Sequence, residues 1–375
     1  MLMLEALRAK HGDALLLHHG TKAKPRVIVI DGGPPGVYPD ALKPRLLELR
    51  TEQKLADATP LDIDLLMVSH IDEDHIAGVL ELMQKLRDQD GPKSWKIARV
   101  WHNAFDDILG NTDASIASTG GGLAPASFDD ILAPEGSLVL ASVGQGRNLR
   151  KAIDFFHLDG NDPFNGLVQR GHAPIKIGNL SLTVIAPDKE RLTALQTDWD
   201  TKIKPILKKE GKKAEVAEFV DGSVYNLSSI VVLVESDGKR ILLTGDGRGD
   251  HTLDGLQKAK LLEHGKLHVD ILKCPHHGSI RNVAKEYFET ITADHYVISA
   301  DGKFDNPDVA TLKLISAARK DDKFTIHLTN PLEEFVKPAI GKAVKKFFDG
   351  EKAAGRKYKL DIRASTDLSV QVPLA

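Results

Sequence analysis

Residues 69–78 read SHIDEDHIAG, and five of the six consecutive side chains at 70–75 are ionisable. They directly follow LLMV at 65–68, an apolar run with the character of a buried strand. Such a stretch is either an ordinary polar turn or a set of ligands gathered around a positive charge. The rest of the sequence distinguishes these two interpretations.

The composition indicates a soluble globular protein. Of the 375 residues, 42% are hydrophobic and 27% charged, which suits one large layered unit or two domains. The net charge of −3 excludes a global attraction to nucleic acid or membrane, so any such contact must be local. The only cysteine, Cys274, cannot form an internal disulfide. With no signal peptide and no apolar run of membrane-spanning length, we expect a cytoplasmic protein that does not associate with membranes.

Strands and helices alternate in both halves of the chain, which favours α/β layers. Residues 14–33 predict two strands joined by a polar turn, and a helix is expected from Ile76 to about residue 89. Residues 104–170 are turn-rich with helical pieces, and we interpret them as an insertion that could cover a site. The later strands are expected at 180–187, 228–236, 240–246 and 269–275.

Four apolar strands end abruptly in His or Asp. They are VIVIDGG at 27–33, LLMVSHIDEDH at 65–75, ILLTGDG at 241–247 and ILKCPHHGS at 271–279. Sites in α/β sheets lie beyond strand ends, where the loops converge. Carboxylates and imidazoles brought together there are poorly accommodated without a cation among them. This donor mixture suits zinc, manganese or iron.

The H-x-D-x-D-H spacing also works locally. In an extended turn, residues two apart face the same side, so His70, Asp72 and Asp74 can converge. His75 joins them as the chain bends into the helix, whereas Glu73 is expected to face solvent.

Three other features favour ordinary structural roles. His18, His19 and Gly20 repeat the letters HHG, but they precede a hairpin turn and are not expected to be ligands. Cys274 lies inside a strand and is expected to be a core thiol. The lysine-rich run at 202–213 is most simply the solvated face of a helix.

With the three ligand-bearing strand ends in order, the chain resembles the metallo-β-lactamase-fold hydrolases. Their signature is H-x-H-x-D-H, followed by a His, a strand-ending Asp and a final His. Within that fold the chain is most similar to the hydrolase domain of the ComEC family. The shared motifs are HGDALLL, VIVIDGG, SHIDEDHIAG, NLSS at 226–229, LLTGD and HHGS. The membrane spans of the ComEC family are absent, so a channel role is not expected.

The resemblance implies an α/β fold, namely a four-layer αββα sandwich that forms one domain over residues 1–375. It also implies two divalent metal ions, Zn or Mn, at one edge of the sandwich. One site would be formed by Asp74, His75, Asp246 and His276. We expect His276 rather than His277, because it follows the strand and Pro275 most directly. The other site would be formed by His70, Asp72 and the bridging Asp246.

The chain departs from the family signature at two positions. Asp72 stands where a His is usual, and Asn226 stands where the middle His ligand is expected. The site around His70 is therefore expected to be poorer in nitrogen ligands, to bind metal more weakly and to prefer manganese.

The resemblance further implies a hydrolase with a metal-activated water. Asp74 would orient the nucleophile, and His277 would contact or protonate the leaving oxygen. Asn226, Ser229 and Ser279 are expected to bind the substrate. Oxygen-rich metal sites favour phosphate-ester cleavage, so the preferred function is a phosphodiesterase or nuclease whose substrate is a phosphodiester such as nucleic acid or a nucleotide.

Two other functions stay open at this point. A hydrolase of a lactam, lactone or thioester would share the site, although the carboxylate-rich set of ligands counts against it. A non-catalytic regulatory or partner-binding protein would keep the fold but lose ligands, and the intact set at Asp74, His75, Asp246 and His276 counts against that. The sequence carries no indication of an oligomeric state.

Overall fold

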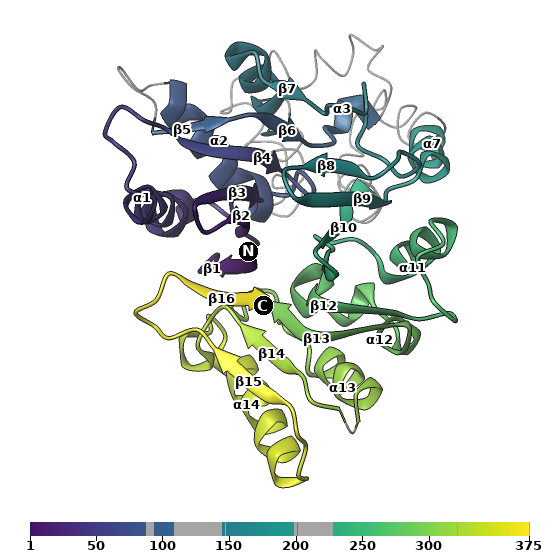
Figure 1. Ribbon diagram of the computed structural model, residues 1–375. Helices are drawn as coiled ribbons and strands as arrows, with labels where there is room; N and C mark the ends of the chain where they lie inside the picture. Colours follow the sequence, from purple (N-terminus) through teal and green to yellow (C-terminus); the bar gives the residue numbers. More distant parts are fainter. Residues whose placement is uncertain are drawn as a thin grey trace, which may run out of the picture.

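Two β-sheets pack face to face, and helices cover the outer face of each (Figure 1). The computed structural model describes residues 1–87, 94–108, 145–146, 148–198, 201, 228–320 and 322–374. Within these residues each sheet has eight strands. The four layers follow the order expected from the sequence, α, β, β and α.

The first sheet is built from the N-terminal half of the chain and the last strand. Its order is β16-β1-β2-β3-β4-β6-β7, with β5 paired to β4. β16, β1, β2 and β3 pair antiparallel, whereas β3, β4, β6 and β7 are parallel. The bounds are β1 (Leu2–Leu7), β2 (Leu15–Thr21), β3 (Lys24–Ile30), β4 (Leu61–Met67), β5 (Trp95–Ile97), β6 (Arg99–Trp101), β7 (Asp159–Gly160) and β16 (Ser369–Leu374).

The second sheet has the order β15-β14-β13-β12-β11-β10-β9-β8. β8 to β11 pair antiparallel and β11 to β15 pair parallel. The bounds are β8 (Ile175–Ile177), β9 (Leu180–Ala186), β10 (Val231–Ser236), β11 (Lys239–Leu243), β12 (Leu267–Lys273), β13 (Ile291–Ile298), β14 (Thr325–Leu328) and β15 (Lys359–Ile362).

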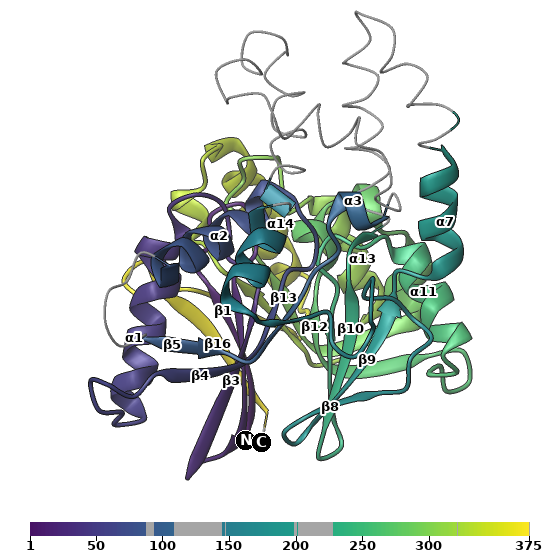
Figure 2. The same ribbon diagram turned by 90° about the horizontal axis from the view of Figure 1, so that it is seen from above.

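The helices lie on the outer faces, where their apolar sides are buried (Figure 2). Those against the first sheet are η1 (Tyr38–Leu42), α1 (Lys43–Glu52) and α2 (Glu73–Arg87). Those against the second are α11 (Gly249–Lys258), α12 (Lys285–Thr290), α13 (Val309–Ala318) and α14 (Pro338–Ala353). The remaining described elements are α3 (Phe105–Ile108), α7 (Lys189–Asp198), η4 (Pro275–Gly278), η5 (Ile280–Asn282) and η6 (Leu332–Glu334).

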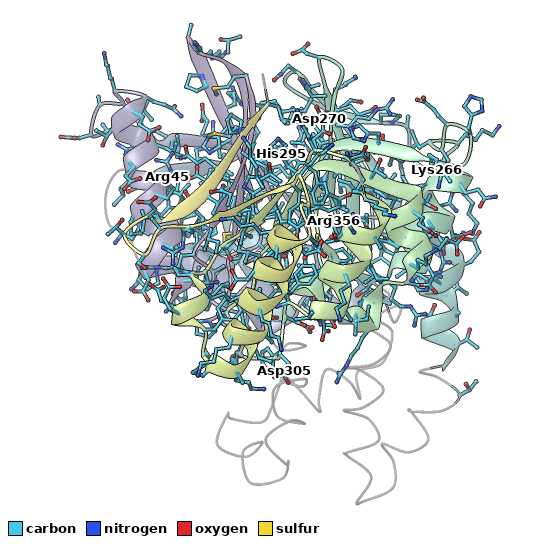
Figure 3. The ribbon with its side chains drawn as sticks, turned by 90° about the horizontal axis from the view of Figure 1, so that it is seen from below. Arg45, Lys266, Asp270, His295, Asp305 and Arg356 are labelled. Atoms are coloured by element: carbon cyan, nitrogen blue, oxygen red, sulfur yellow. The ribbon has the colours of Figure 1, made fainter. Side chains whose placement is uncertain are left out.

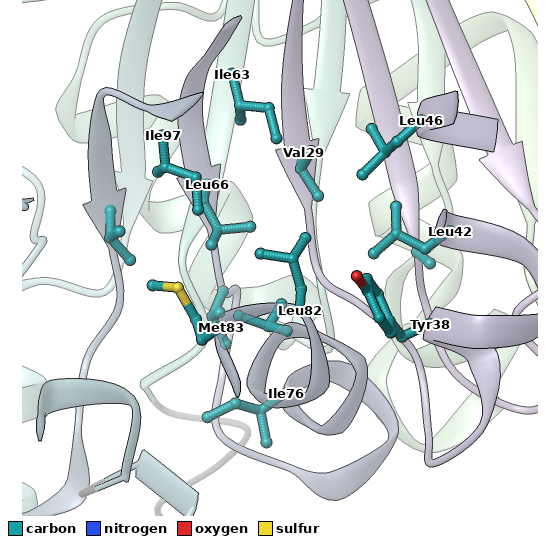
Figure 4. Packing of buried hydrophobic residues seen from close by; sticks show 14 of the residues in the cluster. Val29, Tyr38, Leu42, Leu46, Ile63, Leu66, Ile76, Leu82, Met83 and Ile97 are labelled. Carbon is teal, nitrogen blue, oxygen red and sulfur yellow. The ribbon is translucent and has the colours of Figure 1, made fainter. Parts of the chain in front are cut away.

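The apolar residues of β3 show how the layers are held. Val27 and Val29 face the outer helices, where Figure 4 shows Val29 among Leu46 and Leu82. Ile28 alternates to the other face and packs between the two sheets. Both faces of the strand are thus covered, which explains its continuous apolar run. Each such side chain contributes about 1.5–3 kcal/mol by leaving water, so the sheet faces rather than the loops stabilise the sandwich.

The strand directions place the polar strand ends at one end of the sandwich. Leu2 pairs with Leu374, so both termini lie at the opposite end (Figure 2). The two sheets are linked at the polar end, because the backbone N–H of Ile230 donates to the carbonyl of Ser69 at 2.8 Å. The end of the sandwich at which SHIDEDHIAG lies is therefore also the end at which β3, β11 and β12 finish.

The expected insertion at 104–170 is only partly described, since 109–144 and residue 147 lie outside the described residues. The described part belongs to the sandwich itself. Strand β7 extends the first sheet, and Leu149 and Ile153 pack into the core beneath it. Whether the segment covers a site stays a prediction. Among the described residues, no helix combines the length and apolar character needed to cross a bilayer.

Candidate metal centre

The carboxylate of Asp246 is the hub of the polar end. It follows β11 and is buried, and each of its oxygens faces two imidazoles. Oδ1 lies 3.4 Å from Nε2 of His75 and 3.5 Å from Nε2 of His277. Oδ2 lies 3.5 Å from Nε2 of His276 and 3.7 Å from Nε2 of His70. One carboxylate therefore stands between two pairs of imidazole nitrogens.

Each side of Asp246 has one further carboxylate. Oδ2 of Asp74 lies 3.6 Å from Nε2 of His277, and Oδ2 of Asp72 lies 3.4 Å from Nε2 of His70. Two similar groups result, named here after the Asp246 oxygen that they face. The Oδ1 half consists of Asp74, His75 and His277. The Oδ2 half consists of His70, Asp72 and His276.

This arrangement differs from the expectation for the tandem histidines. His276 was expected beside Asp74 and His75, but His277 lies there and His276 lies on the side of His70. The cause is a tight turn after Pro275, in which φ is 47° at His276, 53° at His277 and 81° at Gly278. Left-handed backbone is unfavourable for the two histidines by about 1 kcal/mol or more each, and such strain gathers at functional sites. The turn directs the two rings to opposite sides of Asp246.

All four imidazoles are oriented in the same way. Each Nδ1 faces a hydrogen-bond partner on the outer side of the centre, so a neutral ring with its proton on Nδ1 directs the Nε2 lone pair at Asp246. Ligand histidines in metal sites are held in this manner. The acceptors are Oδ2 of Asp31 for His75 at 2.8 Å, the carbonyl of Ser299 for His277 at 2.9 Å, Oδ1 of Asn282 for His276 at 2.8 Å and Oγ of Ser69 for His70 at 3.1 Å.

The centre contains buried polar atoms without hydrogen bonds. Nε2 of His70 and Oδ1 of Asp246 have no such partner in the described part of the chain. The Nε2 atoms of His75 and His277 lie only 3.3 Å apart, so two lone pairs face each other when both rings are neutral. Leaving a buried polar atom unsatisfied costs about 1–3 kcal/mol. Ligand atoms of His75, Asp246 and His277 lie within 4.8 Å of one another and of Asp13, whose carboxylate is already paired with Lys273, and this proximity suits a cation between the two histidines and Asp246.

The charges in the centre compensate one another. Burial alone would lower the pKa of His75, but the carboxylates of Asp246, Asp31 and Asp74 outweigh it and raise that pKa well above its ordinary value. Burial likewise would raise the pKa of Asp246, and the surrounding imidazoles, His277 first among them, lower it well below its ordinary value. Asp246 therefore stays ionised at neutral pH and attracts positive charge.

The start of α2 positions Asp74 and His75. The helix begins at Glu73, so Asp74 lies in its first turn rather than in the extended turn expected from the sequence. His75, which was expected where the chain bends into the helix, lies in the same first turn. The carbonyl of Asp72 accepts hydrogen bonds from the N–H groups of His75 at 2.9 Å and Ile76 at 3.0 Å. Acidic residues favour the first helical turn because of the helix dipole, which explains why the helix begins early.

Glycine at position 78 is required by a close approach of two segments. A Cβ atom there would lie 2.0 Å from the carbonyl oxygen of Gly32. Next to Gly32, Asp31 accepts hydrogen bonds from both the N–H and the hydroxyl of Ser69, each at 2.7 Å. The DGG sequence after β3 is therefore the part that fixes SHIDEDHIAG in place, a role that the sequence did not reveal.

A buried ion pair behind His277 was also missed. Oδ2 of Asp13 lies 2.6 Å from Nζ of Lys273, and Oδ1 of Asp13 lies 3.6 Å from Nδ1 of His277. All three side chains are buried. The signal in the sequence was the lysine in the apolar strand ILKCP, because a buried ammonium needs a counter-charge.

The expected substrate-binding residues have local partners or lie outside the described part. The hydroxyl of Ser229 accepts from the N–H of Asp246 at 3.1 Å, and the hydroxyl of Ser279 accepts from the N–H of Arg281 at 3.4 Å. Asn226 lies outside the described residues, as does the lysine run 202–213. Their roles toward a substrate stay predictions.

His18 and His19 of β2 lie beside carboxylates, and Cys274 lies in the core, as expected for a core thiol. Nε2 of His18 lies 2.6 Å from Glu5, and Nε2 of His19 lies 3.0 Å from Asp64. Cys274 is buried in the core between the second sheet and its helices, and burial raises the pKa of its thiol to about 12. A thiol with such a pKa is not a nucleophile at neutral pH.

One comparison with known protein families gave a match over part of the chain. Residues 22–143, which include β3, β4 and the start of α2, match the family model described as the metallo-beta-lactamase superfamily. A comparison with curated proteins gave no match. Among solved structures, the crystal structure of Zn²⁺-bound PqqB from Methylobacterium extorquens is similar with 10% identity and a TM-score of 0.36, covering 99% of this chain and 100% of that one. The family match covers less than half of the sequence, and the αββα layering of the chain agrees with the fold expected from the sequence.

Proposed function

We propose that the protein is a metal-dependent phosphodiesterase, a class that includes nucleases. The observation that carries the proposal is the position of Asp246, whose two oxygens each face two imidazoles. A carboxylate shared between two groups of ligands is suited to a pair of cations, and paired cations are suited to phosphodiester cleavage. An anionic diester also suits a cationic centre better than a neutral lactam does.

The donor sets fit divalent zinc or manganese. Each half would supply two imidazoles, one carboxylate of its own and one oxygen of Asp246. His276 provides the second imidazole of the Oδ2 half, so the change from His to Asn226 leaves this half less poor in nitrogen than the sequence alone suggested. Nε2 of His70 and Oδ1 of Asp246, which have no hydrogen-bond partner among the described residues, agree with this assignment.

The chain's own residues would prepare the reaction. Cations held in the two halves would stabilise charge on a phosphate and lower the pKa of a water molecule. Asp74 lies at the edge of the centre with its side chain 19% exposed, where its carboxylate can orient that water and accept its proton. Both nitrogens of His277 are directed at other groups, Nδ1 at Ser299 and Nε2 at Asp246. This favours His277 as a ligand rather than as the proton donor expected from the sequence.

The test is hydrolysis of bis-p-nitrophenyl phosphate with Mn²⁺ or Zn²⁺, compared with a β-lactam, a lactone and a thioester. We expect metal-dependent turnover of the diester and a decrease of at least about 100-fold in Asp246→Asn, the scale of losing one main electrostatic group. The control Asp250→Asn changes an exposed carboxylate on the neighbouring helix α11. Metal-dependent turnover of the lactam, lactone or thioester alone would contradict the proposal.

A further inference from the structure

Two loops that the proposed chemistry does not use meet beside the candidate metal centre. The first, between β1 and β2, is tied to the centre because the N–H of Asp13 donates to the carbonyl of Asp74 at 3.2 Å. The second follows β13, and its Ser299 donates from Oγ to the carbonyl of Gly12 at 2.6 Å. The Ser299 carbonyl also fixes His277. Farther along the second loop, Nδ2 of Asn306 donates to the carbonyl of His276 at 3.5 Å, so this loop too runs along the rim of the centre.

The second loop exposes an aromatic ring at this rim. Phe304 is 56% exposed, although most large apolar side chains in the described residues are buried. Its turn is well braced: Oδ1 of Asp301 accepts from the N–H of Lys303 at 2.9 Å, and Lys337 bonds Oδ1 of Asp305 at 2.8 Å. Figure 3 labels Asp305, the next residue along this turn. More than half of the surface of this side chain is therefore open to a ligand in solution.

A positive charge accompanies the ring. Nζ of Lys303 lies 4.9 Å from the centroid of Phe304 and 3.3 Å from Nε2 of His11. The His11 ring meets Phe304 nearly edge to face, with centroids 5.2 Å apart and planes at 79°. The ammonium has three donors, so one can go to His11 while the others stay available to a ligand. The rim thus combines an exposed aromatic surface, a lysine and a histidine.

We propose that His11, Lys303 and Phe304 form a subsite for an aromatic group attached to the phosphate, namely a nucleobase. The base stacks on Phe304, as bases stack on aromatic side chains in proteins that bind single-stranded nucleic acid. Lys303 contacts phosphate oxygens as a point charge. The inference rests on the proposed function and names its substrate class as nucleotide phosphodiesters. An aliphatic diester would leave the ring of Phe304 unused.

Binding tests the subsite without any turnover. Calorimetry on Mn²⁺-loaded protein compares thymidine 5′-monophosphate with inorganic phosphate as probes. We expect Phe304→Ala to weaken nucleotide binding about tenfold and phosphate binding by less than twofold. Phe304→Trp should keep nucleotide binding near that of the unaltered protein, because the indole offers the base another aromatic surface. Lys303→Met should weaken both probes. Phe155→Ala is the matched control, because Phe155 is 62% exposed on a different part of the chain. Nucleotide affinity that is undetectable, or unchanged in Phe304→Ala, overturns the subsite.

Kinetics separates this inference from the proposed function. Thymidine 5′-p-nitrophenyl phosphate carries a base and methyl p-nitrophenyl phosphate does not, so Phe304→Ala should raise KM about tenfold for the first alone. A parallel experiment with oligothymidylate distinguishes a polynucleotide substrate from a free nucleotide, since only a strand of several nucleotides can make contacts beyond the subsite. If every diester stays intact while nucleotide binding still depends on Phe304, the phosphodiesterase proposal fails and the subsite stands. If both diesters turn over and neither responds to the substitution, the subsite fails alone.

Discussion

Nδ1 of His75 lies 2.8 Å from Oδ2 of Asp31, and both side chains are buried at the junction of β3 and α2. The same carboxylate accepts two hydrogen bonds from Ser69. Asp31 therefore fixes the ring of His75 and the backbone before His70 together. Asp31 directly follows β3, so the strand holds Asp31 in place, and Asp31 in turn holds residues of the candidate metal centre.

The first prediction concerns this orienting carboxylate. Asp31→Asn should lower the affinity for Zn²⁺ or Mn²⁺ by about 10- to 100-fold, because partners that orient a ligand histidine have effects of this size. Chelator competition measures the affinity. Asp62→Asn, an exposed carboxylate on β4, should leave it unchanged. Equal affinities in the two variants would contradict the role of Asp31.

The second prediction concerns the two halves of the centre. In the Oδ2 half the side chains of Asp72 and His276 are 28% and 30% exposed, whereas His277 in the Oδ1 half is 4% exposed. Water competes more easily for exposed ligands, so the Oδ2 half should bind metal more weakly. Calorimetric titration of metal-free protein should show two unequal affinities.

The same titration identifies which histidine belongs to which half. His276→Ala should remove the weaker binding event and His277→Ala the tighter one, while the exposed His264→Ala removes neither. Loss of the tighter event in His276→Ala would instead support the assignment expected from the sequence. Two equally tight events in the unaltered protein would contradict the exposure argument.

The third prediction concerns the buried ion pair of Asp13 and Lys273. Burial would raise the pKa of Asp13, but Lys273 and His277 outweigh it and lower that pKa, so the pair is ionised at neutral pH. Lys273→Met leaves a buried carboxylate without its partner and should destabilise the metal-free protein by about 3–5 kcal/mol. Urea unfolding measures the change, and Asp13→Asn combined with Lys273→Met should recover part of it.

The matched control for this pair is Lys258→Met, whose ammonium forms ion pairs near the surface. It should destabilise the protein much less than Lys273→Met does, because water screens an exposed ammonium. A similar small cost for Lys273→Met would show that the buried pair contributes little to folding.

The fourth prediction concerns pH and lies away from the centre. Burial would raise the pKa of Glu5, but hydrogen bonds with His18, Arg45 and Ser369 outweigh it and lower the pKa to about 2. A lowered pKa stabilises the fold above the ordinary value near 4.5, and this contribution is lost as pH falls through 2. At 1.36 kcal/mol per pKa unit the contribution is about 3 kcal/mol.

Urea unfolding of Glu5→Gln and of the unaltered protein at a series of pH values tests this. The difference in unfolding free energy should decrease by about 3 kcal/mol between pH 7 and pH 2, with most of the decrease below pH 5. Glu48→Gln, whose side chain is largely exposed, should show a much smaller decrease. A difference that does not depend on pH would show that Glu5 acts only through its packing.

Much of the sandwich and the location of the candidate site could be predicted, because apolar runs that end in His or Asp carry both signals at once. VIVIDGG gave β3, and LLMVSHIDEDH gave β4 and the start of α2. The local turn was harder to predict. Asp74 was expected in an extended turn but lies in a helix, because the helix dipole and backbone hydrogen bonds favour the helix over an extended turn. The sides taken by His276 and His277 depend on three successive residues with positive φ, which HHG letters alone do not indicate.

Contacts between segments that are far apart in the sequence could not be predicted. Asp13 meets Lys273 only because the loop after β1 and the end of β12 reach the same end of the two sheets. No spacing rule connects residues so far apart. The same holds for His11 and Phe304, which come from loops of different sheets.

The central claim is that Asp246 joins two groups of metal ligands, and metal content after equilibrium dialysis tests it most directly. Inductively coupled plasma mass spectrometry should find two Mn²⁺ or Zn²⁺ ions per chain in the unaltered protein and in Asp250→Asn. Asp246→Asn, verified as folded by circular dichroism, should lose at least one ion and bind the other more weakly, because both halves include an oxygen of Asp246. Unchanged stoichiometry and unchanged affinity in Asp246→Asn would contradict the claim.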